Sequence, residues 1–167
     1  MKASICIILL ACIAYAGLAQ DKSKRPSPPA SAEGTIDGVK IKVDYSAPSA
    51  KGRKMLGGIE PYGKVWRTGA NETTSIEFSA PVKIEGKDVP KGKYGLYTLP
   101  GENEWVIIIN KDIKWGAFDY TDKADVIRVT VKPSKTDSFV ETFAIGVDKD
   151  QVTIKWENTM VAFKVKG

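Results

Sequence analysis

The sequence predicts an all-β fold: a single-domain antiparallel β-sandwich, or a barrel-like sandwich, of about nine strands with one long ordered loop. Three observations favour this fold class. Apolar residues recur at every second position in short segments, as they do in half-buried strands. Glycine and proline separate these segments at regular spacing, which is typical of sandwiches and barrels. No ten-residue window has the helical period of 3.6 residues, so helix is expected to be nearly absent.

Residues 1–19 match the pattern of an export signal. Lys2 supplies a positive start, residues 3–16 form an apolar run, and residues 17–19 provide small side chains at the cleavage positions. The run is too short to cross a bilayer as a permanent helix. We therefore expect an exported protein, periplasmic or extracellular, with no transmembrane segment in its mature form. Lipid anchoring at Cys12 is an alternative, which the apolar residues directly after that cysteine disfavour.

Histidine is absent, and both cysteines, Cys6 and Cys12, lie inside the predicted signal. The exported chain is therefore expected to fold on its hydrophobic core alone, without disulfides. A Ser-His-Asp triad, a cysteine nucleophile and a zinc site built on thiolate or imidazole are excluded, and no cofactor is expected. The net charge of +5 is a mild bias without a dense basic stripe, so the sequence does not predict nucleic-acid binding.

Residues 20–33 are rich in proline and serine and contain no apolar side chain larger than alanine. Such a segment buries too little surface to fold, so we expect a flexible linker. Residues 34–167 are expected to form one all-β domain, because a chain of this length is sufficient for one hydrophobic core.

The first strands of this domain are predicted to turn at Asp37-Gly38, a dipeptide that suits the positive φ angles of tight hairpins. Apolar and polar residues then alternate from Val39 to Tyr45. A run of apolar residues from Trp105 to Ile109 predicts a central strand that is buried on both faces. The remaining strands are expected at residues 74–78, 82–84, 94–99, 126–131, 139–147, 151–157 and 161–165.

Two stretches follow neither period, residues 48–72 and residues 111–125. The first contains five glycines and two prolines, which disfavour both helix and strand. It also carries apolar residues that favour burial over disorder, namely Met55, Leu56, Ile59, Tyr62, Val65 and Trp66. Irregular loops of this length are usually functional when they are ordered. We therefore expect an ordered loop packed on the β scaffold, and we expect any ligand to bind there.

The motif PYGKVWRTGANE at residues 61–72 is followed by the segments KGKYGLYTLPGENEWVIIIN, WGAFDY and RVTVKP. In these segments the chain resembles a bacterial family known as domain of unknown function 2911, over roughly residues 25–165. The resemblance implies an exported all-β domain. It implies no activity, cofactor or catalytic residue, so the roles of individual residues rest on physical reasoning.

Six residues of the two irregular stretches are candidates for ligand binding: Trp66, Arg67, Asn71, Glu72, Trp115 and Tyr120. A guanidinium offers a planar fork of donors to an anion, an aromatic ring offers a flat face to a sugar, and an amide both donates and accepts. The competing interpretation is structural. In that case Trp66 belongs to the core, Arg67 pairs with Glu72 or Asp119, and the aromatic residues around Trp115 form a small cluster under a loop.

These residues favour a non-catalytic binding or interaction module whose ligand is a glycan or a small anion. One alternative is a carboxylate-based hydrolase that uses Glu72 or Asp119, since glycoside hydrolysis needs two carboxyl groups about 5–9.5 Å apart. Another is a structural component of the cell envelope without a small ligand. The exposure of Trp66, Arg67 and Trp115 distinguishes this last alternative from the other two. The sequence leaves the oligomeric state open.

Overall fold

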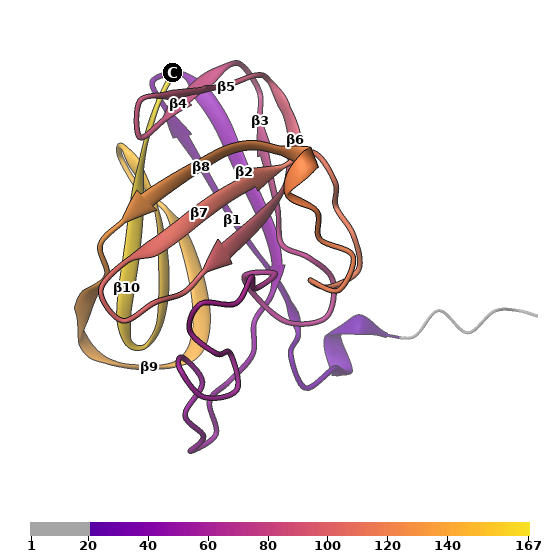
Figure 1. The fold of residues 1–167 in the computed structure, drawn as a ribbon, viewed down its shortest axis with the longest axis vertical. Coiled ribbons are helices and arrows are strands. Elements are labelled where there is room, and N and C mark those ends of the chain that lie inside the picture. Colours follow the sequence, from indigo (N-terminus) through magenta and orange to yellow (C-terminus); the bar gives the residue numbers. More distant parts are fainter. Residues whose placement is uncertain (1–20) are drawn as a thin grey trace, which may run out of the picture.

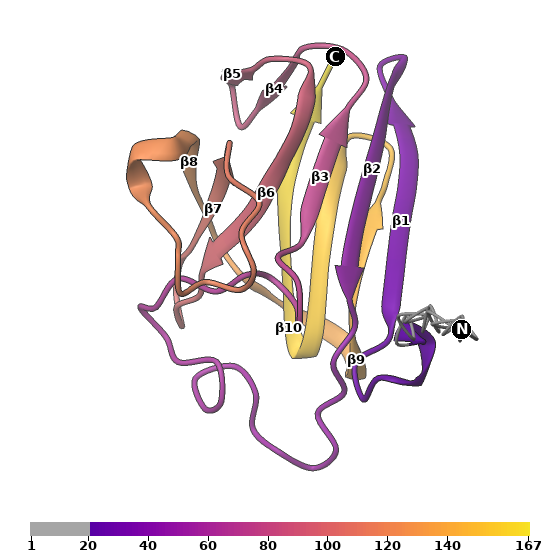
Figure 2. The same ribbon diagram turned by 90° about the vertical axis from the view of Figure 1, so that its right-hand side faces the viewer.

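The computed structural model describes residues 21–167, and the expected export signal and Cys12 anchor lie outside these residues. The described chain folds into two antiparallel β-sheets that face each other (Figure 1, Figure 2). Its elements are η1 (Lys22–Lys24), β1 (Pro29–Ile36), β2 (Val39–Ser46), β3 (Ser75–Phe78), β4 (Val82–Ile84), β5 (Lys87–Val89), β6 (Gly92–Leu99), β7 (Trp105–Asn110), η2 (Asp122–Ala124), β8 (Asp125–Val131), β9 (Ser134–Val147) and β10 (Gln151–Lys166). One sheet has the order β1-β2-β3-β6-β7-β8 and the other the order β5-β4-β10-β9. The predicted all-β sandwich is confirmed.

Alternating side chains orient each strand between core and solvent. In β2, Val39, Ile41 and Val43 are buried while Lys40 and Lys42 are exposed, because successive residues of a strand point to opposite faces. The buried faces of the two sheets enclose one apolar core. Helix in residues 21–167 is limited to two short 3-10 turns, and no helix there has the length and apolar character needed to span a membrane.

The hairpin between β1 and β2 forms at the predicted dipeptide. Asp37 and Gly38 both have positive φ, 49° and 81°, as a two-residue hairpin loop requires. Ile36 and Val39, which flank the dipeptide, lie directly opposite each other. The turn chemistry of the sequence was therefore sufficient to place this hairpin.

The first strand begins earlier than the sequence predicts. β1 pairs with β2 from Pro29 opposite Ser46 onwards, so residues 29–33 belong to the sheet. The prediction of a flexible linker over residues 20–33 is wrong for this part. The reason is that an edge strand is held by backbone hydrogen bonds, which need no large apolar side chain.

β7 is buried on both faces, as its apolar run predicts. Ile107 and Ile109 belong to the core between the sheets, and Ile108 on the opposite face is also fully buried. On that outer face Ile108 lies opposite Tyr97 of β6, whose ring centroid is 5.1 Å from that of Tyr120. The irregular stretch that follows β7 therefore folds back over the outside of the six-stranded sheet.

The long loop between β2 and β3 closes the lower end of the sandwich in both views (Figure 1, Figure 2). It is bonded to both sheets. Trp66 exchanges two backbone hydrogen bonds with Thr98 of β6. The Glu157 carboxylate of β10 accepts hydrogen bonds from the backbone N–H groups of Met55 (3.0 Å) and Leu56 (2.9 Å). The prediction of an ordered loop is confirmed.

Burial within this loop follows the prediction only in part. Met55, Leu56 and Trp66 are buried, whereas Ile59 is 51% exposed and Tyr62 is 36% exposed. Ile59 belongs to a tight turn, which a hydrogen bond from its N–H group to the carbonyl of residue 54 closes. Such a turn satisfies its own backbone and leaves one side in solvent, so hydrophobicity alone did not decide which side chains are buried.

Candidate functional site

The two irregular stretches meet on the outer face of the six-stranded sheet. The Thr73 hydroxyl donates a hydrogen bond to the Gly116 carbonyl (3.0 Å). Arg67 lies alongside the same glycine, because a Cβ atom added to Gly116 would be 4.0 Å from Cδ of Arg67. The end of the long loop and the middle of residues 111–125 thus share one surface.

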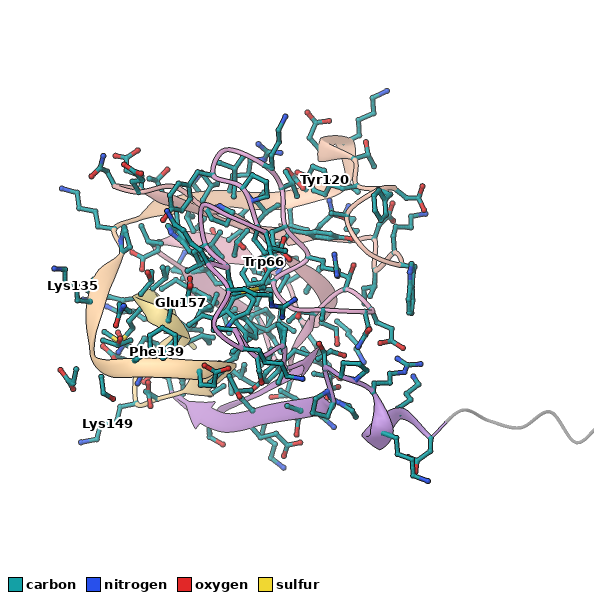
Figure 3. The ribbon with its side chains drawn as sticks, turned by 90° about the horizontal axis from the view of Figure 1, so that it is seen from below. Trp66, Tyr120, Lys135, Phe139, Lys149 and Glu157 are labelled. Atoms are coloured by element: carbon teal, nitrogen blue, oxygen red, sulfur yellow. The ribbon has the colours of Figure 1, made fainter. Side chains whose placement is uncertain are left out.

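Trp66 lies in the core rather than on this surface. Its side chain is only 3% exposed, and its ring stacks on that of Trp156 at a centroid distance of 5.7 Å. The indole N–H group donates to the Gly69 carbonyl (3.0 Å), so its polar atom is satisfied internally. Seen from below, Trp66 lies at the centre of the molecule (Figure 3). So little exposure leaves no ring face open to a ligand, and Trp66 is removed from the candidate binding residues.

Asn71 and Glu72 are held by the segment that precedes β1. The Asn71 amide donates to the Ser27 carbonyl (2.9 Å), and the Glu72 carboxylate accepts two hydrogen bonds from Arg25 (2.9 and 3.1 Å) and pairs with Lys22 (3.2 Å). Burial acts to raise the pKa of Glu72, but the hydrogen bonds from Arg25 and Lys22 outweigh it and lower the pKa to about 2. Glu72 therefore stays ionised, which disfavours a role as a proton donor.

The expected pairing of Arg67 with Glu72 or Asp119 is wrong. Glu72 is already paired with Arg25, which lies in the segment that the sequence indicated as a linker. Within residues 21–167, the Arg67 side chain forms no hydrogen bond or ion pair, and its Nε atom is buried without a partner. A buried donor that lacks a partner is uncommon and calls for an explanation.

Two threonines close to Arg67 in the sequence are, in contrast, satisfied. Thr68 donates its hydroxyl hydrogen bond to the Thr98 hydroxyl (3.1 Å), and the Thr74 hydroxyl donates to the Thr68 carbonyl (2.6 Å). These residues fix the end of the long loop to β6. Arg67 therefore differs from the side chains on either side of it.

Glu60 is a carboxylate whose pKa is influenced by the charge of Arg67. It lies half-buried on the long loop. Burial raises the pKa of Glu60, and the positive charge of Arg67 opposes that change. The two side chains thus influence each other, but among the described residues they form no ion pair. The donors of Arg67 therefore have no acceptor among residues 21–167.

Two aromatic side chains are exposed in the stretch that meets Arg67 at Gly116. Trp115 is 60% exposed and Phe118 is 93% exposed. Gly116 lies between Arg67 and Phe118, since a Cβ atom on this glycine would be 3.5 Å from the Phe118 ring, and its φ of 70° favours glycine. The unpaired Arg67 side chain and the exposed Phe118 ring therefore lie beside the same glycine, next to Trp115 in the sequence.

Tyr120 has a structural role in this stretch. Its hydroxyl donates to Oδ2 of Asp125 (2.7 Å) and accepts a hydrogen bond from Arg128. Burial and the hydrogen bond to Asp125 raise the pKa of Tyr120 to about 12. These contacts tie the irregular stretch to β8, and they leave Tyr120 less free to bind a ligand than Trp115.

A family model described as "Protein of unknown function (DUF2911)" matches residues 27–165. The chain belongs to the DUF2911 family. The resemblance inferred from the motif is thus confirmed, and the matched region of the DUF2911 domain includes all of β1. Comparisons with curated proteins and with solved structures found no match.

The geometry explains most of the DUF2911 motif at residues 61–72 as architecture. Trp66 fills the core, and Asn71 and Glu72 hold the segment before β1. Arg67 is the exception. In the part of the DUF2911 domain that the structure describes, no group of three or more His, Cys, Asp or Glu side chains could hold a metal ion.

The sequence places Phe118 in the aromatic group around Trp115 and Glu60 among the carboxylates near the loops, but neither was among the six candidates for ligand binding. Phe118 had a usable signal, because it lies in an irregular stretch without alternation and directly precedes a charged residue. Glu60 had no such signal. Its half-burial depends on how the loop folds against Trp66 and Arg67, and spacing along the chain does not reveal that contact.

Proposed function

We propose that this DUF2911 domain is a non-catalytic, extracytoplasmic binding module for a polar ligand, a glycan or a small anion, held by Arg67 and Trp115. The unpaired Arg67 guanidinium is the observation that carries the proposal. Trp66, Thr68 and Asn71 of the same motif bond within the protein, whereas Arg67 has a buried donor without a partner.

A buried donor without an acceptor costs free energy, because it has lost its water and gained no protein partner. Nε itself is closed to solvent, so a ligand contacts the guanidinium through its other donors. The remaining guanidinium donors, which belong to a half-buried side chain, reach the solvent side of the same surface. Their planar arrangement suits carboxylate, phosphate or a pair of sugar hydroxyl groups.

Trp115 supplies the second part of the site. An exposed indole offers a flat apolar face, and sugar rings present a matching face of C–H groups. Phe118, whose ring lies beside Gly116, provides a further exposed aromatic ring. Binding pockets commonly combine such apolar walls with a few well-placed polar groups, which is the combination found here.

Tryptophan fluorescence provides a direct test. Trp66, Trp105 and Trp156 are at most 3% exposed, so a ligand that stacks on Trp115 changes the signal of the one solvent-exposed tryptophan. The protein is titrated with neutral oligosaccharides, uronic-acid oligosaccharides, phosphate and sulfate. We expect a saturable change with at least one of these classes. The change is expected to disappear in Trp115→Phe, which keeps an aromatic ring but removes the reporter.

Arg67 is tested in the same assay. Arg67→Ala is expected to weaken binding at least about tenfold, and Arg67→Lys to restore little of it, because a point charge does not reproduce the guanidinium fork. Lys64→Ala is the matched control, since Lys64 is an exposed basic residue of the same motif and its loss should leave binding unchanged. Equal binding in Arg67→Ala and Lys64→Ala would exclude Arg67 from the site.

A carboxylate-based hydrolase is the second candidate, and Glu60 is the residue that favours it. A proton donor needs a raised pKa, and burial raises the pKa of Glu60 whereas the contacts of Glu72 lower its pKa. Chromatography of the oligosaccharides after long incubation separates the candidates. Binding without cleavage supports the module, and cleavage that Glu60→Gln abolishes supports the hydrolase. A structural envelope component predicts neither binding nor cleavage.

A further inference from the structure

A pocket lies at the lower end of the molecule, and Arg67 is not among its lining residues. It has a volume of about 350 Å³, and residues from four separate segments line it: Tyr62, Gly101, Glu102, Pro133, Ser134, Lys135, Asn158 and Thr159. Figure 3 views the molecule from this end and labels the lining residue Lys135 on β9 and also Glu157 on β10, the residue before the lining residue Asn158. None of these lining residues belongs to the site proposed above.

Four of the lining side chains have polar groups without a protein partner. The Tyr62 hydroxyl, the Glu102 carboxylate, the Lys135 amine and the Asn158 amide form no hydrogen bond or ion pair with any residue in the described range 21–167. Together they supply donors and acceptors to one open pocket. Their single negative and single positive charges balance, so the pocket has no strong preference for an ion.

Tyr62 provides the aromatic surface of this pocket. Its ring packs against the backbone at Gly57, where a Cβ atom would come within 2.5 Å of the ring. This contact fixes the ring while leaving the residue 36% exposed. Burial, together with the negative charges of Glu102 and Glu157, raises the pKa of Tyr62, so its hydroxyl stays a neutral donor.

A local distortion of β10 turns Asn158 towards the pocket. The pairing of β10 with β9 shifts register on both sides of Glu157, and Glu157 has a φ of 52°, which is unusual for a residue other than glycine. Bulges of this kind redirect the side chains next to them. The Glu157 carboxylate holds the distortion in place by accepting the N–H groups of Met55 and Leu56.

We infer that this pocket binds a neutral sugar. A positioned aromatic ring, surrounded by an unpaired carboxylate, amine, amide and hydroxyl, offers what a sugar requires: a stacking face together with both acceptors and donors for its hydroxyl groups. The inference does not depend on Arg67, because the two sites share no residue. One chain would then contact a glycan at two separate positions.

Nuclear magnetic resonance of ¹⁵N-labelled protein tests the inference at the Asn158 side-chain amide. The labelled protein is titrated with N-acetylglucosamine, cellobiose and maltose, and separately with glucuronate and glucosamine as charged sugars. We expect saturable shifts of the Asn158 amide and of the Glu102 backbone amide with at least one neutral sugar. Larger shifts with glucuronate or glucosamine, or no shift with all three neutral sugars, would overturn the inference.

Variants assign the shifts to the pocket. Tyr62→Ala is expected to weaken binding about tenfold or more, and Tyr62→Phe, which keeps the ring, by only a few-fold. Because Tyr62 also packs on Gly57, Asn158→Ala is made as a second variant at an exposed position, and it too should weaken binding. Arg67→Ala should leave these shifts unchanged. Shifts that persist in both Tyr62→Ala and Asn158→Ala would show that the sugar binds elsewhere.

Discussion

Two parts of this domain lack regular secondary structure. They differ in how extensively they are hydrogen-bonded to the sheets and in whether their aromatic side chains are buried. The long loop is bonded to both sheets and buries Trp66 between them. The stretch of residues 111–125 is tied to the sheet at its ends and at Gly116, and between these points it exposes Trp115 and Phe118. Irregular backbone is therefore not itself a sign of function. The informative feature is a group that the protein leaves unsatisfied.

The largest expected contrast is between the tryptophans of the two stretches. Trp66→Ala is expected to destabilise the protein by roughly 3–5 kcal/mol, because it leaves a cavity beside Trp156 and removes an aromatic stack. Trp115→Ala is expected to change the free energy of unfolding by less than about 0.5 kcal/mol, since its side chain is mainly in solvent. Urea denaturation of both variants measures the two values. Similar losses would mean that the two stretches are equally structural.

The anchoring of the long loop by Glu157 gives the next largest effect. Glu157→Ala removes the acceptor of two backbone N–H groups, at Met55 and Leu56, and is expected to cost roughly 1–3 kcal/mol. Limited proteolysis should then cut the loop near Lys54 earlier than in the parent protein. Asp122→Ala, at an exposed position of the second stretch, is the control and should alter neither stability nor cleavage. An unchanged cleavage pattern in Glu157→Ala would contradict the assigned anchor.

The fold was largely predictable because period-two alternation and turn chemistry are local properties of the chain. The Asp37-Gly38 hairpin and the doubly buried β7 both follow from them. The pairing of β1 from Pro29 did not, because edge pairing depends on backbone bonds to a neighbour rather than on side-chain pattern. The same limit explains why the Arg25–Glu72 pair was missed, with 46 residues between its two partners.

Of the candidate site, the sequence predicted only the two irregular stretches. The structure shows that the end of the first stretch meets the second at Gly116. The sequence did not separate Trp66, which is buried, from Trp115, which is exposed, because both tryptophans precede similar polar or glycine-rich segments. Burial of a loop residue depends on long-range packing, and a single sequence does not contain that information in readable form.

A smaller effect of unusual sign is expected at Arg67. Arg67→Ala removes a buried Nε donor that has no acceptor, so the free energy of unfolding should stay the same or increase by up to about 1 kcal/mol. A paired, buried arginine would instead lose about 3–5 kcal/mol on the same change. Urea denaturation in the absence of any ligand distinguishes these outcomes. A large loss would show that Arg67 has an internal partner and would remove the main support for the binding site.

The smallest effects concern Glu72 and Glu60, two carboxylates of the long loop that repeat the contrast between satisfied and unsatisfied groups. The pKa of Glu72 is lowered from 4.5 to about 2, so its contribution to stability is present above pH 4.5 and is lost as the pH falls towards 2. The pKa of Glu60 is raised above 4.5, so its ionised form opposes folding. Its effect on stability therefore becomes more favourable as the pH falls through the raised pKa towards 4.5.

The two variants Glu72→Gln and Glu60→Gln are consequently expected to shift the melting temperature in opposite directions. At pH 7, Glu72→Gln should melt below the parent protein, because it weakens the bonds from Arg25 and Lys22, and this difference should shrink between pH 4.5 and 2. At pH 7, Glu60→Gln should melt slightly above the parent, because a neutral amide is less costly to bury than a carboxylate without a direct ion pair. That difference should have disappeared once the pH reaches 4.5. Melting curves from pH 7 to 2 check both trends, and a shift of the same sign in both variants would mean that Arg67 satisfies Glu60 as fully as Arg25 satisfies Glu72.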